Sequence, residues 1–324
     1  MKAWIVKEAG NLASLEMVER DIPKPSDGQI RVRVGAIGLN SADLQMIDGH
    51  HPRQPQFPYM PGMEVAGTVV DQHDDAFGVF PGDHVMAWLP YGGLAEEVIV
   101  DSGCCWVAPR SLSMVETAAY LMSYGTAHLA LNRRARLADD ETLLVLGAGG
   151  AMGAAAVALG RIKGVQIVAA AGGAEKCELA RTMGADHVID VNTEDLADRM
   201  AALNIKADVV FDPVGGDLFR QALSTISHEG RIISLGYAGG EIQEMHADEL
   251  LWRNIDLIGF ELGGYLPGHW EAVRQGFSSL AHAISDGRMT PYVGHVFPFE
   301  KAMEAYKLLA ERRRVGKVVL HIHD

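Results

Sequence analysis

Residues 142–153 of the chain read TLLVLGAGGAMG, and residues 154–160 continue as AAAVALG. A short run rich in Leu and Val that breaks on closely spaced glycines and resumes as an Ala-rich segment is typical of a strand, a tight turn and a helix. Glycine lets the backbone turn sharply and lets a pyrophosphate come close, while free N–H groups and the positive end of the following helix face the anion. The stretch therefore predicts a dinucleotide-binding turn.

The glycines of this turn follow the spacing G-x-x-G-x-x-G rather than G-x-G-x-x-G. We expect Gly153 to lie where the helix crosses the strand, because a side chain there would push the two apart. A glycine-rich turn can also serve backbone conformation alone, but the βα units downstream favour dinucleotide binding. The cofactor-binding candidates of this stretch are Gly147, Gly150, Ala151, Met152 and Gly153.

Composition sets the class of protein. With 324 residues, 48% of them hydrophobic, and a mean hydropathy of +0.06, the chain is long enough for about two globular domains. Its 28 Lys and Arg against 42 Asp and Glu give a formal charge of −14, which repels nucleic acid and anionic membranes. We find no apolar run of about 18 residues that could span a bilayer. We therefore expect no nucleic-acid or membrane partner and a cytoplasmic location.

Three cysteines, Cys104, Cys105 and Cys177, are too few and too poorly spaced for a disulfide framework or a zinc knuckle. We expect them to be core thiols.

The first third of the chain is expected to be β-rich, because β-branched or alternating runs are separated there by Pro and Gly turns. These runs are residues 2–6, 30–34, 64–70, 84–88 and 95–100. Helices dominate from about Ser113, and after Thr142 strands alternate with helices. The later strands are expected at residues 142–146, 166–171, 187–189, 208–211, 231–235 and 256–260. This alternation predicts an α/β fold with a parallel, doubly wound sheet.

The last segment of the chain is expected to fold back onto the first domain. Its pattern predicts helices over residues 270–286 and 299–311 and strands over residues 293–297 and 318–322.

Six motifs, in order along nearly the whole chain, carry a family resemblance. They are residues 38–43 (GLNSAD), 57–67 (FPYMPGMEVAG), 81–85 (PGDHV), 184–188 (GADHV), 212–216 (DPVGG) and 316–320 (GKVVL). The chain resembles the medium-chain dehydrogenase/reductase superfamily, and within it the zinc-independent quinone oxidoreductases. The resemblance implies a GroES-like β-barrel catalytic domain over residues 1–119 and 262–324 and a Rossmann domain over residues 120–261, with an active-site cleft between them.

Zinc ligands are replaced in this sequence. The zinc-dependent alcohol dehydrogenases of the superfamily have Cys at the position of Asn40 and His at the position of Met63, and neither replacement is a good zinc ligand. The superfamily's structural-zinc lobe of four cysteines is also missing. We therefore expect no metal, and we expect Glu64 to form an ion pair or a hydrogen bond.

The end of the second strand of the doubly wound sheet bears on the cofactor. NAD enzymes place an acid there to hold the ribose 2′-hydroxyl, but this chain has Gly172 and Gly173 and no acid before Glu175. NADPH is therefore the expected cofactor. By resemblance, Lys176 and Arg312 bind its 2′-phosphate; the alternative is that both are only solvated surface charges.

Other site residues are also implied by the resemblance. Asn40 is expected beside the nicotinamide ring, and Thr126 within reach of the phosphates or the amide. The remaining cofactor candidates follow the last strands of the sheet, where open α/β folds bind ligands; they are Leu235, Gly236, Tyr237 and Phe260. Asp43 is expected to cap the helix that it opens.

The reaction follows from the missing zinc. Without a Lewis acid, alcohol oxidation loses its main driving element, whereas hydride transfer to an electrophilic acceptor needs only hydrogen-bond donors and a proton. We therefore predict an NADPH-dependent reductase of quinones or α,β-unsaturated carbonyls. The alternatives are an enoyl-thioester reductase and a non-catalytic NADPH-binding protein with a structural or redox-sensing role, as in lens crystallins of the family.

Two further expectations concern the proton and the assembly. His51 takes the position of the Tyr that donates a proton in enoyl-thioester reductases, so it is the candidate acid, with bulk water as the alternative. Residues 254–260 read as the last strand of the sheet, and an apolar edge strand invites pairing with a second copy. We expect a homodimer.

Overall fold

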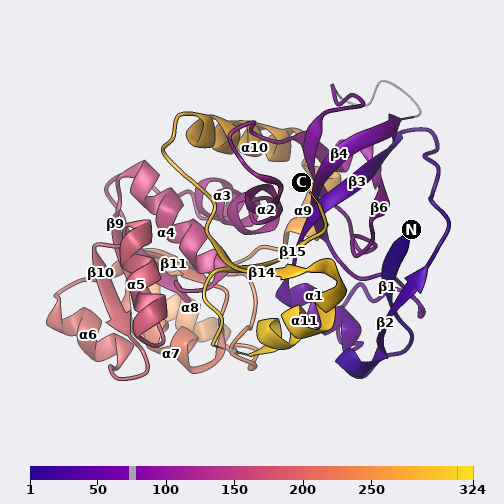
Figure 1. Ribbon diagram of the computed structural model, residues 1–324. Helices are drawn as coiled ribbons and strands as arrows, with labels where there is room; N and C mark the ends of the chain where they lie inside the picture. The colour runs from indigo at the N-terminus through magenta and orange to yellow at the C-terminus, as the bar shows by residue number, and fades with distance from the viewer. Residues whose placement is uncertain (73–77, 312, 324) are drawn as a thin grey trace. The chain divides into compact units, whose positions relative to one another are not determined.

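The structure is a computed structural model that describes residues 1–72, 78–311 and 313–323 (Figure 1). The chain divides into two compact units, Met1–Met122 with Ala281–Asp324, and Ser123–Leu280. Residues 262–280, which we expected with the first domain, therefore belong to the second unit. Their contacts explain this: a Cβ atom on Gly125 would come within 2.5 Å of the Phe277 ring, and the Tyr265 hydroxyl accepts a hydrogen bond from Arg133.

The second unit is built on a parallel sheet with the strand order β10-β9-β8-β11-β12-β13. The strands are β8 (Thr142–Leu146), β9 (Gln166–Ala171), β10 (His187–Asp190), β11 (Ala207–Asp212), β12 (Ile226–Ser234) and β13 (Asp256–Gly259). Chain order runs outward from β8 to β10 in one direction and from β11 to β13 in the other. The doubly wound sheet expected from the sequence is confirmed, and its order reverses between β8 and β11, where such folds bind ligands.

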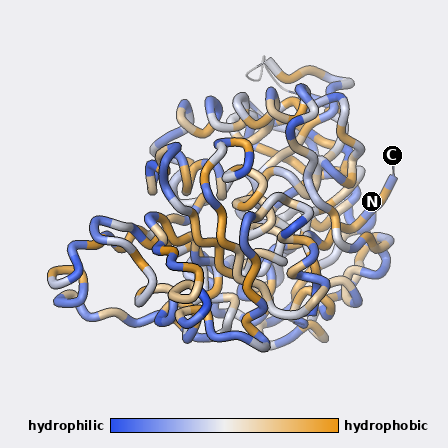
Figure 2. Tube along the Cα trace, turned by 90° about the vertical axis from the view of Figure 1, so that its left-hand side faces the viewer, coloured by the Kyte–Doolittle hydropathy of each residue, from blue (hydrophilic) through white to orange (hydrophobic). Residues whose placement is uncertain are grey.

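Helices alternate with these strands and surround them in Figure 1. They are α4 (Ala151–Lys163), α5 (Ala174–Met183), α6 (Leu196–Ala202), α7 (Gly216–Thr225) and α8 (Ala247–Arg253), followed after β13 by α9 (Leu262–Tyr265), η5 (Leu266–Gly268) and α10 (Trp270–Ser285). Strands covered on both faces need apolar residues at consecutive positions, and residues 143–146 are completely buried. In Figure 2 hydrophobic stretches gather in the interior of the trace, while many outer turns are hydrophilic.

The first unit is built on a sheet with the strand order β14-β15-β3-β4-β5-β7, with β6 paired to β3, and on the separate pair β1-β2. The strands are β1 (Lys2–Val6), β2 (Leu15–Glu19), β3 (Gln29–Gly38), β4 (Glu64–Gln72), β5 (His84–Trp88), β6 (Glu97–Asp101), β7 (Cys105–Val107), β14 (Val293–Pro298) and β15 (Lys317–His321). Strands β2 and β7 were not expected; β7 spans three residues, and β2 pairs with β1 outside the larger sheet. Such short or isolated strands carry little pattern of their own.

The helices of the first unit are short. They are η1 (Leu12–Ser14), α1 (Ser41–Ile47), η2 (Ser102–Cys104), α2 (Met114–Ala118), η6 (Phe299–Lys301) and α11 (Ala302–Ala310). The helix expected over residues 299–311 therefore begins as a 3₁₀ turn. The three cysteines are buried free thiols, as expected. Among the helices of the described residues, none is long and apolar enough to cross a membrane.

Candidate functional site

The glycine-rich turn joins β8 to α4 with the expected geometry. Gly147 has a φ of +64°, which L side chains rarely adopt, and its carbonyl accepts the N–H of Gly150 at 3.0 Å. A Cβ atom on Gly153 would lie 2.3 Å from the Gly147 carbonyl oxygen, so the helix can cross the strand only with glycine at this position. The expectation for Gly153 is therefore confirmed.

The first turn of α4 is open to an anion. Gly150 is its N-cap residue and has no side chain to bond the amide groups that follow. The N–H groups of Ala151 and Met152 lack an intrahelical acceptor by their position, and the helix dipole adds positive potential there. Since α4 is 13 residues long, this end has the features of a phosphate-binding helix terminus.

Lys176 lies against this turn. A Cβ atom on Gly149 would come within 2.3 Å of the Lys176 Cβ and 2.5 Å of its Cγ, so the lysine stem covers the glycine. The two residues belong to consecutive βα units, since β8 and β9 pair in parallel. The structure thus brings the candidate phosphate-binding lysine to the candidate phosphate-binding turn.

The loop after β9 is held by an acid that the sequence analysis missed. Gly172 and Gly173 follow the strand, and Gly173 has a φ of +91°. The Asp190 carboxylate, from the end of neighbouring β10, accepts the N–H groups of Gly173 at 2.8 Å and Asn192 at 3.0 Å. No local pattern marks this role, because Asp190 reaches the loop only through the pairing of β10 with β9.

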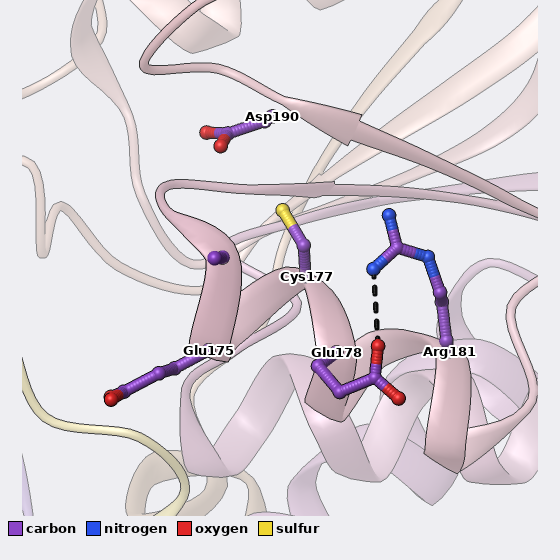
Figure 3. A pocket seen from close by; sticks show the side chains of 6 residues that line it. Glu175, Cys177, Glu178, Arg181 and Asp190 are labelled. Atoms are coloured by element: carbon purple, nitrogen blue, oxygen red, sulfur yellow. Dashed lines mark hydrogen bonds and ion pairs between the residues drawn. The ribbon is translucent and has the colours of Figure 1, made fainter.

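A hollow beside α5 shows where a phosphate would be unfavourable (Figure 3). The residues that line it include Glu175, Glu178 and Asp190, together with Cys177 and Arg181. Arg181 pairs with Glu178 at 3.2 Å. Acidic groups predominate on this side of α5, so a phosphate is better accommodated where Lys176 meets the glycine turn.

The remaining cofactor candidates of the second unit follow the carboxyl ends of its strands. The Leu235 N–H bonds to the Asp212 carbonyl at 2.8 Å, and the Phe260 N–H bonds to the Ser234 carbonyl at 3.1 Å. Thr126 is 6% exposed in α3 (Thr126–His128), which packs against α4. The π-helical turns η3 (Leu121–Gly125) and η4 (Leu129–Arg134) flank α3, and such turns are frequent at functional sites.

The first unit contains a buried polar cluster formed by Asn40, Glu64 and Lys317. The Lys317 ammonium lies 2.5 Å from Glu64 Oε2 and 2.7 Å from Asn40 Oδ1. The other carboxylate oxygen of Glu64 accepts the Met122 N–H at 2.8 Å. The ion pair expected for Glu64 is confirmed. Lys317 itself was missed as a site residue, although a lysine directly before the apolar run of β15 is an unusual residue to bury.

Lys317 fixes the orientation of the Asn40 amide. An ammonium group only donates hydrogen bonds, so the Asn40 atom that faces it must be the carbonyl oxygen. Asn40 Nδ2 then donates to the Gly38 carbonyl at 3.0 Å and to Glu64 Oε2 at 3.3 Å. Both amide protons are directed at protein acceptors. Asn40 can therefore offer a ligand a lone pair of Oδ1, but no N–H donor.

Asp43 lies beside this cluster at the start of α1. Its Oδ2 accepts the backbone N–H of Asn40 at 2.8 Å, so its expected role as a helix cap is confirmed. The residue is completely buried, and burial raises the pKa of its carboxyl from 3.8 to about 7. Lys317 opposes this rise in the pKa, and the Glu64 charge adds to it.

His51 and Arg312 are the two remaining candidate site residues. His51 lies in the loop after α1, where its Nδ1 accepts the Arg53 N–H at 3.1 Å. The neutral ring therefore carries its proton on Nε2. Arg312 lies outside the described residues, so its contact with a phosphate stays a prediction.

The second unit therefore joins a parallel, doubly wound sheet to a glycine turn suited to an anion, which is the architecture of a nucleotide-dependent dehydrogenase. Two family models match this chain: an alcohol dehydrogenase GroES-like domain over residues 26–110 and a zinc-binding dehydrogenase over residues 183–320.

Known proteins resemble the whole chain. Quinone oxidoreductase-like protein 2 of Bos taurus is 35% identical over 310 residues, which are 94% of this chain and 89% of that protein. The human synaptic vesicle membrane protein VAT-1 homolog is 33% identical over 315 residues, covering 92% and 80%. The solved quinone oxidoreductase of Thermus thermophilus, described also in complex with NADPH, has 34% identity and a TM-score of 0.86, covering 99% of this chain and 100% of that one. The chain belongs to the quinone oxidoreductase branch of the medium-chain dehydrogenase/reductase superfamily.

The residues at the superfamily's catalytic-zinc position do not fit that metal. Asn40 and Met63 are poor zinc donors, and the Lys317 ammonium already binds the oxygen atoms of Asn40 and Glu64. A zinc ion there would have to displace a buried cation. In the part of the chain that the structure describes, no group of three or more His, Cys, Asp or Glu residues is arranged to hold a metal.

Proposed function

We propose that the protein is an NADPH-dependent, zinc-independent reductase that transfers hydride to a quinone or an α,β-unsaturated carbonyl compound. The observation that carries the proposal is the position of Lys176 against Gly149, which adds a cation to an anion-binding turn. The NADPH complex of the 34% identical Thermus protein supports the same choice of cofactor.

The proposed cofactor site uses the second unit. The glycine turn and the open end of α4 would bind the pyrophosphate, and Lys176 with Arg312 would bind the 2′-phosphate. Gly172 and Gly173 would lie beside the ribose, while Leu235, Gly236, Tyr237, Phe260 and Thr126 would position the nicotinamide. When bound, the cofactor supplies the hydride.

The acceptor chemistry is argued from the buried polar cluster. Lys317 binds the oxygen atoms of Asn40 and Glu64 that would otherwise face a metal ion. We therefore propose acceptors whose reduction needs no Lewis acid. A quinone or enone accepts hydride at carbon, its oxygen becomes an anion, and that anion takes one proton. We propose that Asn40 Oδ1 accepts a hydrogen bond from a donor group of the cofactor or of the acceptor molecule. Asn40 cannot itself donate, because both of its amide protons are used within the protein.

Two sources of the proton are proposed. His51 would donate from Nε2 as the imidazolium, so its Nδ1 must first take up a proton from solvent and release the Arg53 N–H; the ring is left neutral after the transfer. Bulk water is sufficient for a quinone, whose reduced form is readily protonated.

One activity panel tests the proposal against its alternatives. NADPH oxidation is followed with a naphthoquinone, an enone and an enoyl-CoA ester, each with and without a chelator. We expect turnover of the quinone or the enone that survives chelation. Turnover only of the enoyl-CoA ester would favour the enoyl-thioester reductase, and NADPH binding without any turnover would favour the structural or redox-sensing role.

The proposal includes assembly and location. We propose a homodimer formed through β13, because this edge strand exposes Leu257 and adjacent α8 exposes Leu251 and Trp252. A cytoplasmic location is proposed from composition alone.

A further inference from the structure

A second hollow of the second unit lies at the carboxyl end of the edge strand β13. It is lined mainly by Arg133, Arg134, Gly259, Phe260, Tyr265 and His269. The carboxyl ends of strands are the edge at which open α/β sheets bind ligands. Of these residues, only Phe260 belongs to the cofactor site proposed above.

One wall of this hollow is aromatic. The rings of Phe260 and Tyr265 meet edge to face, with centroids 5.1 Å apart, and Tyr265 stacks on His269 at 4.0 Å with an interplanar angle of 6°. The His269 Nδ1 lies 3.1 Å from the Tyr265 carbonyl oxygen, which holds the stacked pair in register. Three rings in fixed positions offer a preformed contact surface for a planar ring system.

The hollow is also cationic. Arg133 donates from Nε to the Tyr265 hydroxyl, and Arg134 donates from Nη2 to the Gly259 carbonyl at 3.1 Å. Both acceptors are uncharged, so neither contact neutralises a guanidinium. Elsewhere in the same unit arginines pair with carboxylates, as Arg231 does with Glu141 at 2.6 Å. In a chain of net charge −14, two adjacent arginines on neutral acceptors are suited to a negatively charged ligand.

Glu261 also lines the hollow, and its carboxylate is hydrogen-bonded to the backbone. The carboxylate oxygens of Glu261 accept the N–H groups of Gly263 at 2.8 Å and Gly264 at 2.7 Å, which caps α9. Space for a ligand lies over Gly259, where an added Cβ atom would meet no atom within 4 Å.

We propose that this hollow binds a planar aromatic acid, with its ring on the Phe260, Tyr265 and His269 wall and its acidic group on Arg133 and Arg134. The site goes beyond the proposed reductase function, since its ligand is neither the cofactor nor the acceptor. Bidentate guanidinium contacts favour a carboxylate or a sulfonate over a neutral substituent of the same shape.

A calorimetric titration with 2-naphthoate, using the neutral isostere 2-naphthamide as a comparison, tests the proposal. The full chain is used in its solution assembly, without NADPH or acceptor, so that the result is independent of turnover. We expect 2-naphthoate to bind at least about tenfold more tightly than 2-naphthamide, since the amide loses the charge-assisted bonds. Equal affinity for the two probes would overturn the proposal.

Variants locate the site. Arg133→Gln and Arg134→Gln should each weaken 2-naphthoate by about tenfold. Gly259→Leu should abolish binding by filling the open space; because Gly259 ends β13, the strand proposed for the dimer, its mass by light scattering should stay that of the native protein. The controls are Arg220→Gln, on an exposed residue of α7, and Gly268→Leu, also in open space but outside the lining; both should bind as the native protein does. Loss of binding in the controls, or its retention in Gly259→Leu, would contradict the assignment.

A competition experiment separates this hollow from the cofactor site, because Phe260 lines one and is a candidate for the other. Saturating NADPH should leave 2-naphthoate bound. Displacement of 2-naphthoate in proportion to NADPH would assign the acid to the cofactor site and overturn the proposal.

Discussion

Lys317 and Glu64 form an ion pair within the core of the first unit: Nζ lies 2.5 Å from Oε2, and their side chains are 2% and 0% exposed. The pair joins β15 to β4, which begins at Glu64. Taking two charges out of water is costly, so such a pair is stable only while both members are present and their other hydrogen bonds are made.

Loss of one partner should therefore destabilise the fold. We expect Lys317→Met to lower the free energy of unfolding by about 3–5 kcal/mol, because it leaves an unpaired buried carboxylate. The double variant Lys317→Met, Glu64→Gln should recover much of this loss, since the glutamine can still accept the Met122 N–H. Urea unfolding of the three proteins measures both effects; equal losses in the single and double variants would contradict the argument.

Asp43 should make stability depend on pH. Burial raises the pKa of its carboxyl from 3.8 to about 7, so between these values the folded state holds a proton that the unfolded state has released. Stability should therefore fall as the pH rises through this window, and the loss should be complete above about pH 7. In Asp43→Asn this contribution should vanish, because the amide cannot ionise.

Urea unfolding at about pH 5 and about pH 8 tests this sign. The native protein should lose more stability between the two conditions than Asp43→Asn does. Glu116→Gln, at a half-buried helix cap of α2, serves as the control and should follow the native protein. An identical pH dependence in native protein and Asp43→Asn would contradict the prediction.

Lys176 should select the phosphorylated cofactor. We expect Lys176→Ala to weaken NADPH roughly tenfold to a hundredfold, the equivalent of about 1.5–3 kcal/mol for a lost charge-assisted bond, and to leave NADH unchanged. Arg312→Ala is expected to act alike. Arg181→Ala removes a cation from the acidic side of α5 and should change neither affinity. Equal dissociation constants for NADPH and NADH in the native protein would refute the cofactor argument.

The edge strand β13 should mediate dimerisation. Leu257 is 40% exposed on this strand, and Leu257→Lys should convert the dimer to a monomer by placing like charges on facing strands. Light scattering at micromolar concentration gives the mass. Val296→Lys is the matched control, because Val296 is 52% exposed on β14 at the edge of the other sheet. A monomeric native protein would rule out the assembly.

His51 should matter for one class of acceptor. If it donates the proton, His51→Ala should lower enone turnover by at least about tenfold and remove a pH dependence near pH 6–7, while barely affecting a quinone. Steady-state rates with both acceptors across pH decide this. If both respond alike, or neither does, bulk water supplies the proton.

Features of the fold that depend on residues close together in the chain could be predicted from the sequence. The bounds of β5, β8 and β9 agree with the expected ranges, because each is a continuous apolar run closed by a clear turn. The position of Gly153 was also predictable, since the crossing of helix and strand follows from the motif. In each case the determining residues are neighbours in the chain.

Contacts between distant residues were not predictable in the same way. Lys317 meets Asn40 across most of the chain, and Asp190 reaches Gly173 only because β10 pairs with β9. Neither contact leaves a periodic signal, and the donor capacity of Asn40 changes entirely once Lys317 faces it. Residues 262–280 show the same limit, since their assignment to the second unit depends on the Phe277 and Tyr265 contacts.

The contact between Gly149 and Lys176 couples the residues that positions 149 and 176 can accept. A methyl group at 149 would overlap the lysine stem, so any larger residue there must push the ammonium to a new place or be rejected. Replacing the cation alone leaves an uncovered glycine, and replacing the glycine alone misplaces the cation. Redesign of this protein for the unphosphorylated dinucleotide would therefore have to vary positions 149 and 176 together, as a single two-residue library.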